Sequence, residues 1–292
     1  MVYNSLFREE DFPNGQVYSV RKNGLVGWFY PYSEYMPYEG TLESVLSDLE
    51  FMKGIDTSEM DSRQRIIWHA PRIIRGVLDY KANVIYFNDS KHNAPELVLT
   101  AAQAVLDIYA NPLRISQAVR EIRDYFSSND VFNGILDTPI KQKSDDITFE
   151  STSPRYSNHA VNCLLNKFKG KDLCFVITAH GGVPAGLDVF LRYQSSSDNG
   201  DSIVYPVRYS TDKFEDINPR LTKAEIDYLK DTRKNRPVII FDEDIASGTT
   251  IQGMKSFFSN RIFPKKKIFI MANQEGEQEI MGKLNGFEWK TS

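Results

Sequence analysis

The chain has few of the features that mark a secreted, membrane-bound or zinc-binding protein. Only two cysteines, Cys163 and Cys174, occur among its 292 residues, which rules out a disulfide framework. No run approaches the roughly 18 consecutive apolar residues of a membrane helix, and the N-terminal segment MVYNSLFREEDF has neither the basic flank nor the apolar stretch of a signal peptide. The four histidines form no HxxxH or HExxH pattern and no CxxC occurs, which argues against a dedicated zinc site. We therefore expect a cytoplasmic protein that works in a reducing compartment.

An excess of positive charge is missing as well. Lys and Arg number 35 against 39 Asp and Glu, which gives a formal net charge of −4. We expect no non-specific nucleic-acid binding from this balance, because such binding depends on clustered cationic side chains that neutralise phosphates. Charged residues at 25% and apolar residues at 41% are typical of a globular chain, and the length fits one large or two ordinary domains.

The first half of the chain mixes short elements. Asn23-Gly24 between two β-rich runs predicts a hairpin over residues 16–30. Apolar spacing predicts a helix whose buried face consists of Leu42, Val45, Leu46, Leu49 and Met52. Further predicted elements are a short strand at residues 84–87 and helices at 96–110 and 115–126, separated by Asn111-Pro112. Residues 127–158 are polar and rich in turn formers, so we expect a linker or long insertion there.

The second half alternates between apolar runs and helical stretches. The runs, which are typical of buried strands, lie at residues 173–178, 202–207, 237–241 and 267–271, and the predicted helices at 156–168, 223–233 and 250–258. Thr222 followed by Glu225 is a capping-box pattern that predicts the start of a helix. This alternation predicts a parallel sheet covered by helices on both faces, in which ligands bind at the carboxyl ends of the strands. A site is therefore expected in the loops after Thr178 and Phe241.

The loop after Phe241 combines acidic and phosphate-binding features. Asp242 and Glu243 end the predicted strand, and the small-residue turn Ala246-Ser247-Gly248-Thr249-Thr250 opens the next helix. Backbone N–H groups at a helix N-terminus, with Gly allowing close approach and Ser or Thr adding donors, can hold a phosphate. Carboxylates repel a phosphate, so they contribute to binding only if they contact another part of the ligand, such as sugar hydroxyls or a bound Mg²⁺. The combination favours a phosphorylated sugar; the alternative is a strand that ends in solvated carboxylates and a Ser N-cap, with no ligand.

This segment resembles the PRPP-binding motif of the type I phosphoribosyltransferases, in which four apolar residues and two acidic ones precede a small-residue turn ending in Ser/Thr-Gly-x-Thr. The resemblance, which extends over roughly residues 155–275, implies that Asp242 and Glu243 hold the ribose 2- and 3-hydroxyls of 5-phosphoribosyl-1-pyrophosphate (PRPP). It also implies that Ala246, Ser247, Gly248, Thr249 and Thr250 bind the 5-phosphate. Two positions depart from the family's pattern. Asp244 fills a slot that is usually apolar, and Ala246 stands where the 6-oxopurine enzymes have an acidic residue, which argues against hypoxanthine or guanine as the acceptor.

The loop after Thr178 contains His180, Gly181 and Gly182, and glycines let a peptide turn its N–H groups toward an anion. In the resemblance this is the pyrophosphate loop, with His180 as a pyrophosphate donor that is stronger when protonated. The alternative for His180 is a loop histidine capped by the backbone. Three other interpretations of the loop lack required residues. Leu187-Asp188 replaces the Lys-Ser/Thr of a P-loop, the glycine spacing is not that of a dinucleotide fingerprint, and an α/β-hydrolase needs a histidine after His180.

A third segment follows the run at 202–207. Tyr209 and Ser210 loosely match the region that leads into the family's flexible lid, and exposed strand-end residues are the alternative. Arg208 or Lys213 could reach pyrophosphate, although the spacing does not demand it. The family's acceptor pocket is a variable hood outside the core. Here the N-terminal region or the tail around Phe287–Trp289 could supply it, so the sequence does not identify the acceptor.

The predicted fold is α/β, with a parallel-sheet phosphoribosyltransferase-type core that has helices on both faces over residues 151–292, plus a mixed α+β region over residues 1–150. The resemblance implies Mg²⁺-dependent transfer of a phosphoribosyl group from PRPP to a nitrogenous, nucleobase-like acceptor, with release of pyrophosphate. Mg²⁺ would be bound through PRPP, with Asp242 and Glu243 nearby. The alternatives are a non-catalytic protein that senses PRPP or a nucleotide, and a domain that acts through protein contacts. We expect no membrane partner. The sequence does not determine the oligomeric state, and a homodimer is one of the possibilities.

Overall fold

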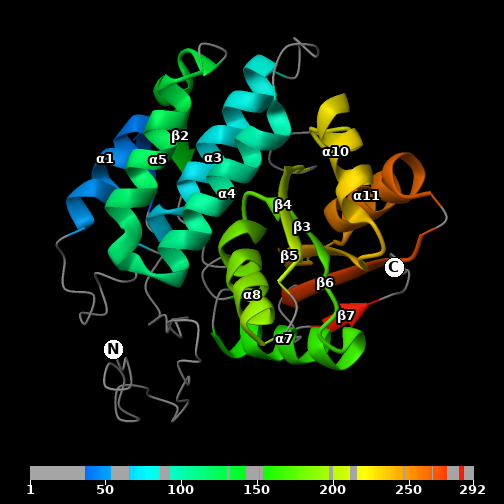
Figure 1. Cartoon of the computed structure of the whole chain (residues 1–292). Helices are drawn as coiled ribbons and strands as arrows, with labels where there is room; N and C mark the ends of the chain where they lie inside the picture. The colour runs from blue at the N-terminus through cyan, green and yellow to red at the C-terminus, as the bar shows by residue number, and fades with distance from the viewer. Residues whose placement is uncertain are drawn as a thin grey trace, which may run out of the picture.

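The structure is a computed structural model of the chain. It describes residues 37–53, 66, 68–85, 93–129, 132–142, 151, 154–196, 200–210, 216–245, 247–264, 266–274 and 283–285. The hairpin predicted over residues 16–30 lies outside these ranges. The described residues form an N-terminal helical group with a two-stranded sheet, and a five-stranded sheet with its own helices (Figure 1). None of the helices among them is both long enough and apolar enough to cross a bilayer.

The N-terminal group is built from helices that pack side by side, together with two short strands. Its elements are β1 (Tyr38–Thr41), α1 (Leu42–Met52), α3 (Pro71–Tyr80), the π-helix η2 (Lys81–Ile85), α4 (Ala94–Ala110), the 3-10 turn η3 (Pro112–Arg114), α5 (Ile115–Ser127), the 3-10 turn η5 (Ile135–Asp137) and β2 (Pro139–Gln142). A capping box between Thr41 and Ser44 starts α1. The predicted apolar face of that helix is confirmed, since Leu42, Val45, Leu46 and Leu49 are fully buried.

Two predictions for this half are wrong. Val84 and Ile85 belong to η2, which continues α3, and not to a strand. The chain stays helical there because Lys81, Ala82 and Ile85 are all buried on the helical spacing. The expected linker at 127–158 contains β2, which pairs antiparallel with β1 and buries Ile140. A four-residue strand is too short for an alternating pattern to reveal, and its partner lies far away in the sequence.

The larger sheet has the order β4-β3-β5-β6-β7. The strands are β3 (Cys174–Ala179), β4 (Ile203–Arg208), β5 (Val238–Asp244), β6 (Ile268–Gln274) and β7 (Lys283–Asn285). The first four in this order run parallel and β7 is antiparallel. The helices are α7 (Pro154–Phe168), α8 (Gly182–Ser196), α10 (Lys223–Arg233) and α11 (Thr249–Phe257), which continues into the π-helix η6 (Phe258–Ile262).

Helices cover the sheet on both sides. Helices α7 and α8 pack on one face, while α11 packs on β5 and β6 on the other, and Tyr228 of α10 contacts the ring of Tyr205 in β4 (Figure 1). The capping box of Thr222 and Glu225 begins α10 as predicted. An α/β architecture with a parallel sheet and helices on both faces is therefore confirmed.

The two parts of the chain share one hydrophobic core. Helix α4 lies against β4 and α8, so its buried face joins the core of the sheet. A buried ion pair, 2.6 Å between Lys81 Nζ and Glu225 Oε1, also links η2 to α10. The N-terminal helices thereby reach the edge of the sheet at β4, which brings α3 close to the strand ends described next.

Candidate functional site

Two loops meet at the carboxyl edge of the sheet. Strands β3 and β5 are parallel neighbours, so the loops that follow them emerge side by side. A Cβ placed on Gly181 would lie 1.6 Å from Glu243 Oε1, and one on Gly182 would lie 3.3 Å from Asp242 Oδ1. Only glycine leaves room for the carboxylate against this peptide. The structure thus brings Gly181 and Gly182 against Asp242 and Glu243. Gly182 is already the first residue of α8, and the two carboxylates belong to the end of β5, so the loops themselves are shorter than the sequence predicts.

Asp242 is a buried carboxyl group beside a second one. Its exposed fraction is 8%, and the Glu243 N–H donates to Asp242 Oδ1 at 3.1 Å. Burial raises the pKa of Asp242 well above its ordinary value, and the neighbouring charge and side-chain hydrogen bond of Glu243 raise this pKa further. Asp242 is therefore not one of the solvated carboxylates of the ligand-free alternative. A carboxyl group whose pKa is strongly shifted, at the end of a parallel strand, is typical of a functional site.

The turn after β5 forms the N-terminus of α11. Gly248 is the N-cap residue and has φ +75°, a left-handed conformation that favours glycine. Ser247 Oγ accepts from the Thr249 N–H at 3.3 Å, so Ser247 turns its hydroxyl back to the start of the helix without being the N-cap. Ser247 and Thr249 are exposed and Thr250 is half-buried, while Ala246 lies outside the described residues. The first-turn N–H groups of α11 point out of the helix at the same sheet edge as the carboxyl pair.

His180 faces the N-terminal helices. The chain leaves β3 at the Ala179–His180 peptide bond, which is cis. His180 Nε2 lies 3.1 Å from Asp79 Oδ1 on α3. Burial lowers the pKa of His180, and although Asp79 acts in the opposite direction the net shift is downward. We therefore expect a neutral imidazole at pH 7, so the stronger, protonated form of the predicted donor is not expected there. Its role toward pyrophosphate stays a prediction.

Asp79 is the centre of a cluster of charges that sequence analysis missed. Arg208 Nη1 donates to Asp79 Oδ1 at 2.9 Å, and Arg75 Nε lies 3.8 Å from Asp79 Oδ2. Burial acts to raise the pKa of Asp79, but His180, Arg208 and Arg75 together outweigh it and hold this pKa below its ordinary value. The spacing of Arg75 and Asp79 indicates only an ordinary pair on one helix face. Nothing local in the sequence signals that they reach the loop after β3.

Tyr209 and Ser210 are both held in place by contacts with other parts of the chain. Tyr209 is 5% exposed, and a Cβ on Gly253 of α11 would lie 2.2 Å from its hydroxyl oxygen, so its ring packs against that helix. The Ser210 N–H donates to the Asp216 carboxylate at 3.2 Å, and the Asp216 N–H donates to the Ser210 carbonyl at 3.0 Å. Tyr209 is therefore not an exposed strand-end residue. Residues 211–215, which include Lys213, lie outside the described residues, and a lid there stays a prediction.

The side chains of Asp242 and Glu243 are of the chemical type that binds Mg²⁺. Mg²⁺ is usually held by one or two carboxylates together with substrate phosphates and water. The charged neighbours that raise the pKa of Asp242 are acidic, Glu243 and Asp244, so a cation bound here would relieve their repulsion. In the part of the chain that the structure describes, no group of three or more His, Cys, Asp or Glu side chains is arranged as a metal site.

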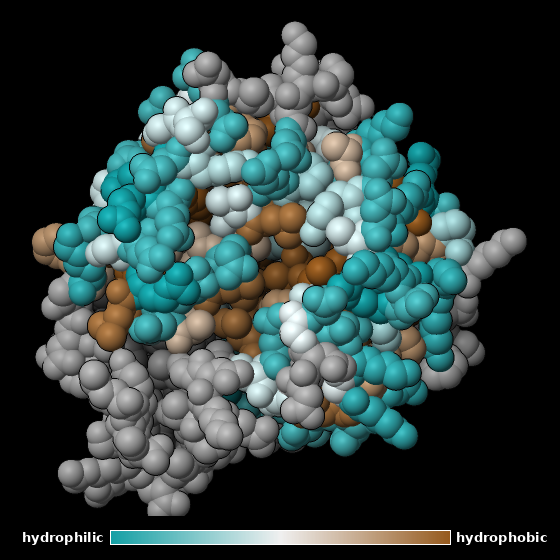
Figure 2. All heavy atoms as spheres, in the orientation of Figure 1, coloured by the Kyte–Doolittle hydropathy of each residue, from teal (hydrophilic) through white to brown (hydrophobic). Residues whose placement is uncertain are grey.

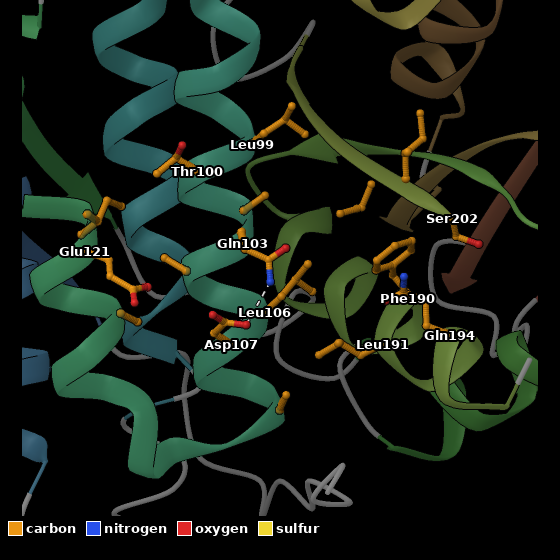
Figure 3. A pocket seen from close by; sticks show the side chains of 17 residues that line it. Leu99, Thr100, Gln103, Leu106, Asp107, Glu121, Phe190, Leu191, Gln194 and Ser202 are labelled. Carbon is orange, nitrogen blue, oxygen red and sulfur yellow. Dashed lines mark hydrogen bonds between the residues drawn. The ribbon is translucent and has the colours of Figure 1, made fainter. Parts of the chain in front are cut away.

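A cavity of about 540 Å³ lies elsewhere, between α4, α5, α8 and the start of β4 (Figure 3). Its walls are mainly apolar, with Leu106 and Phe190 among them, and Gln103 Nε2 donates to Asp107 Oδ1 at 2.9 Å within it. Figure 2 shows this face as a hydrophobic hollow between hydrophilic flanks. The cavity includes Ser202 and Ile203, at the amino end of β4. Because parallel sheets bind ligands at the carboxyl ends of their strands, we do not assign the phosphate-sugar site to it.

Comparison of the chain with protein-family models, with curated proteins and with solved structures found no match.

Proposed function

We propose that this protein transfers a phosphoribosyl group from PRPP to a nitrogenous, nucleobase-like acceptor, with Mg²⁺ bound and pyrophosphate released. One observation carries the proposal. The buried Asp242 carboxyl with its half-buried neighbour Glu243, the Gly181-Gly182 segment and a helix N-terminus meet at one edge of a parallel sheet, and the two glycines contact the carboxylates. Groups that attract hydroxyls or a cation thus lie beside groups that attract phosphates.

Each element has a separate task in this proposal. Asp242 and Glu243 accept hydrogen bonds from the ribose 2- and 3-hydroxyls and so orient C1 toward the acceptor. The N–H groups at the start of α11 and the hydroxyls of Ser247 and Thr249 bind the 5-phosphate. The backbone of Gly181 and Gly182 faces the pyrophosphate, where preorganised donors favour the charge that develops on departure.

Magnesium, when bound, would neutralise the pyrophosphate and favour its departure. The chain's own contribution is the carboxyl pair. In the ligand-free protein burial and Glu243 keep the pKa of Asp242 high, and hydroxyl donors or a cation at this point would favour its ionised form. Ligand binding is therefore expected to lower the pKa of Asp242.

A calorimetric titration with PRPP tests the proposal. We expect micromolar binding that depends on Mg²⁺ and is lost in the double variant Asp242→Asn/Glu243→Gln. The matched control is Asp227→Asn/Asp231→Asn, which changes the net charge equally at two exposed positions of α10 and should bind as the unmodified protein does. Unchanged binding in the Asp242/Glu243 variant, or no binding by the unmodified folded protein, would refute the site assignment.

Catalysis is tested by the release of pyrophosphate from PRPP in the presence of a panel of nucleobases. Acceptor-dependent release that disappears in the Asp242→Asn/Glu243→Gln variant supports transfer. Mg²⁺-dependent PRPP binding without release for any acceptor would overturn the enzymatic proposal and favour a PRPP-sensing protein instead.

A further inference from the structure

The Asp79 cluster lies directly beside the loop that the proposed function assigns to pyrophosphate. Arg208 is the last residue of β4 and is in register with Ala179, the last residue of β3. His180 comes next in the chain and is followed by Gly181 and Gly182. The Asp79 carboxylate, which contacts both Arg208 and His180, therefore lies at the rim of that loop although it belongs to α3.

The cluster resembles an anion-binding site in which the Asp79 carboxylate is the bound anion. Two guanidinium groups, of Arg208 and Arg75, flank one carboxylate, and an imidazole nitrogen approaches the same oxygen that Arg208 contacts. Guanidinium pairs bind carboxylates and phosphates by the same charge-assisted hydrogen bonds, so a diphosphate competes for the groups that hold Asp79.

The cluster is mostly buried but is not closed off from solvent. The side chains of His180, Arg208, Asp79 and Arg75 keep exposed fractions of 10%, 12%, 15% and 17%. In contrast, the Lys81–Glu225 pair nearby in the chain has exposed fractions of 0% on both sides and is inaccessible to any ligand. A ligand anion can therefore replace the Asp79 carboxylate in its ion pairs, whereas none can replace Glu225 in its pair with Lys81.

We propose that Asp79 is an internal competitor of pyrophosphate, an autoinhibitory carboxylate that α3 places, beside its own Arg75, against Arg208 and His180. The inference rests on the proposed function, because it takes the loop after β3 as the pyrophosphate loop. Binding of a diphosphate displaces the Asp79 carboxylate from Arg208 and Arg75, which then bind the ligand. Affinity for diphosphates is therefore set by how firmly α3 holds Asp79 in place.

The test uses inorganic pyrophosphate, without Mg²⁺, titrated calorimetrically into the full chain. Asp79→Asn keeps the size of the side chain and removes its charge, and we expect it to bind pyrophosphate at least about tenfold more tightly than the unmodified protein. The matched control is Asp107→Asn, which also removes a carboxylate paired with an arginine, at 3.4 Å from Arg114 Nη1, and should leave the affinity unchanged. Adding Arg208→Gln to Asp79→Asn should abolish the gain.

Equal or weaker binding by Asp79→Asn would overturn the proposal, because a residue that merely positions Arg208 and His180 gives that result. Circular dichroism establishes that each variant is folded. If Asp79→Asn does not fold, Asp79→Ser replaces it in the same titration, with the same expected and overturning results.

Failure of this inference and failure of the proposed function are distinguishable. If PRPP binds with Mg²⁺ and depends on Asp242 and Glu243, but Asp79→Asn gains no affinity for pyrophosphate, the function stands and Asp79 is structural. If pyrophosphate binding tightens in Asp79→Asn but PRPP fails to bind, the anion exchange stands and the phosphoribosyl assignment falls.

Discussion

Replacing Lys81 by Met should strongly destabilise the whole protein. Lys81 and Glu225 are both fully buried, with 2.6 Å between Nζ and Oε1. Glu225 Oε1 also accepts from the Tyr205 hydroxyl at 2.8 Å, and Oε2 accepts from the Thr222 N–H at 2.7 Å. Lys81→Met keeps the length of the side chain and removes only the cation, so Glu225 retains two donors but loses its countercharge.

The magnitude follows from the burial of both groups. Breaking a buried ion pair by removing one partner costs on the order of 3–5 kcal/mol, because the remaining charge has no compensation in the interior. Since folded domains have a total stability of only about 5–15 kcal/mol, this is a large fraction of it. Glu225→Gln should cost a similar amount. In the double variant Lys81→Met/Glu225→Gln, the loss of unfolding free energy should be smaller than the sum of the two single losses by at least about 1 kcal/mol.

Urea unfolding followed by circular dichroism measures these losses, and the midpoint for Lys81→Met should fall by about 1–2 M. The control is Lys141→Met, because the Lys141–Glu39 pair has side-chain exposures of 73% and 77% and should change stability by less than about 0.5 kcal/mol. A loss as small for Lys81→Met as for Lys141→Met would refute the reasoning. So would a transition confined to one half of the chain, because the pair joins η2 to α10 across one continuous core.

Two further predictions concern a buried histidine and the glycine loop. Burial, with help from Arg72, lowers the pKa of His69 to about 3, so the folded state holds it neutral and stability is lost as pH falls below the unfolded value of 6.5. His69→Gln should reduce the loss of unfolding free energy between pH 7 and pH 5 by up to about 2 kcal/mol, and identical losses in both proteins would contradict this. Gly181→Ala should displace the Glu243 carboxylate and weaken PRPP binding at least about tenfold with little change in thermal midpoint, whereas Gly200→Ala, which meets no atom within 4 Å, should bind normally.

Local signals in the sequence account for most of the elements around the sheet. The apolar runs that end at Thr178 and Phe241 are strands in the structure, and Thr222 with Glu225 starts α10. These predictions succeed because a buried parallel strand and a helix cap each depend on residues within a few positions of one another. The strand predicted at residues 84–87 failed because short apolar runs do not distinguish a strand from a buried helical turn.

The sequence by itself determined that this is an α/β chain, and it singled out the two loops whose residues meet at the sheet edge. Strand order was decided only in the tertiary structure, where β3 and β5 became neighbours and brought Gly181 against Glu243. The same holds for the ionic contacts of the N-terminal half. Asp79 meets His180 and Arg208 across 101 and 129 residues, and Lys81 meets Glu225 across 144. Such pairs leave no periodic or adjacent trace in the sequence, because only the packing of whole helices against the sheet brings the charges into contact.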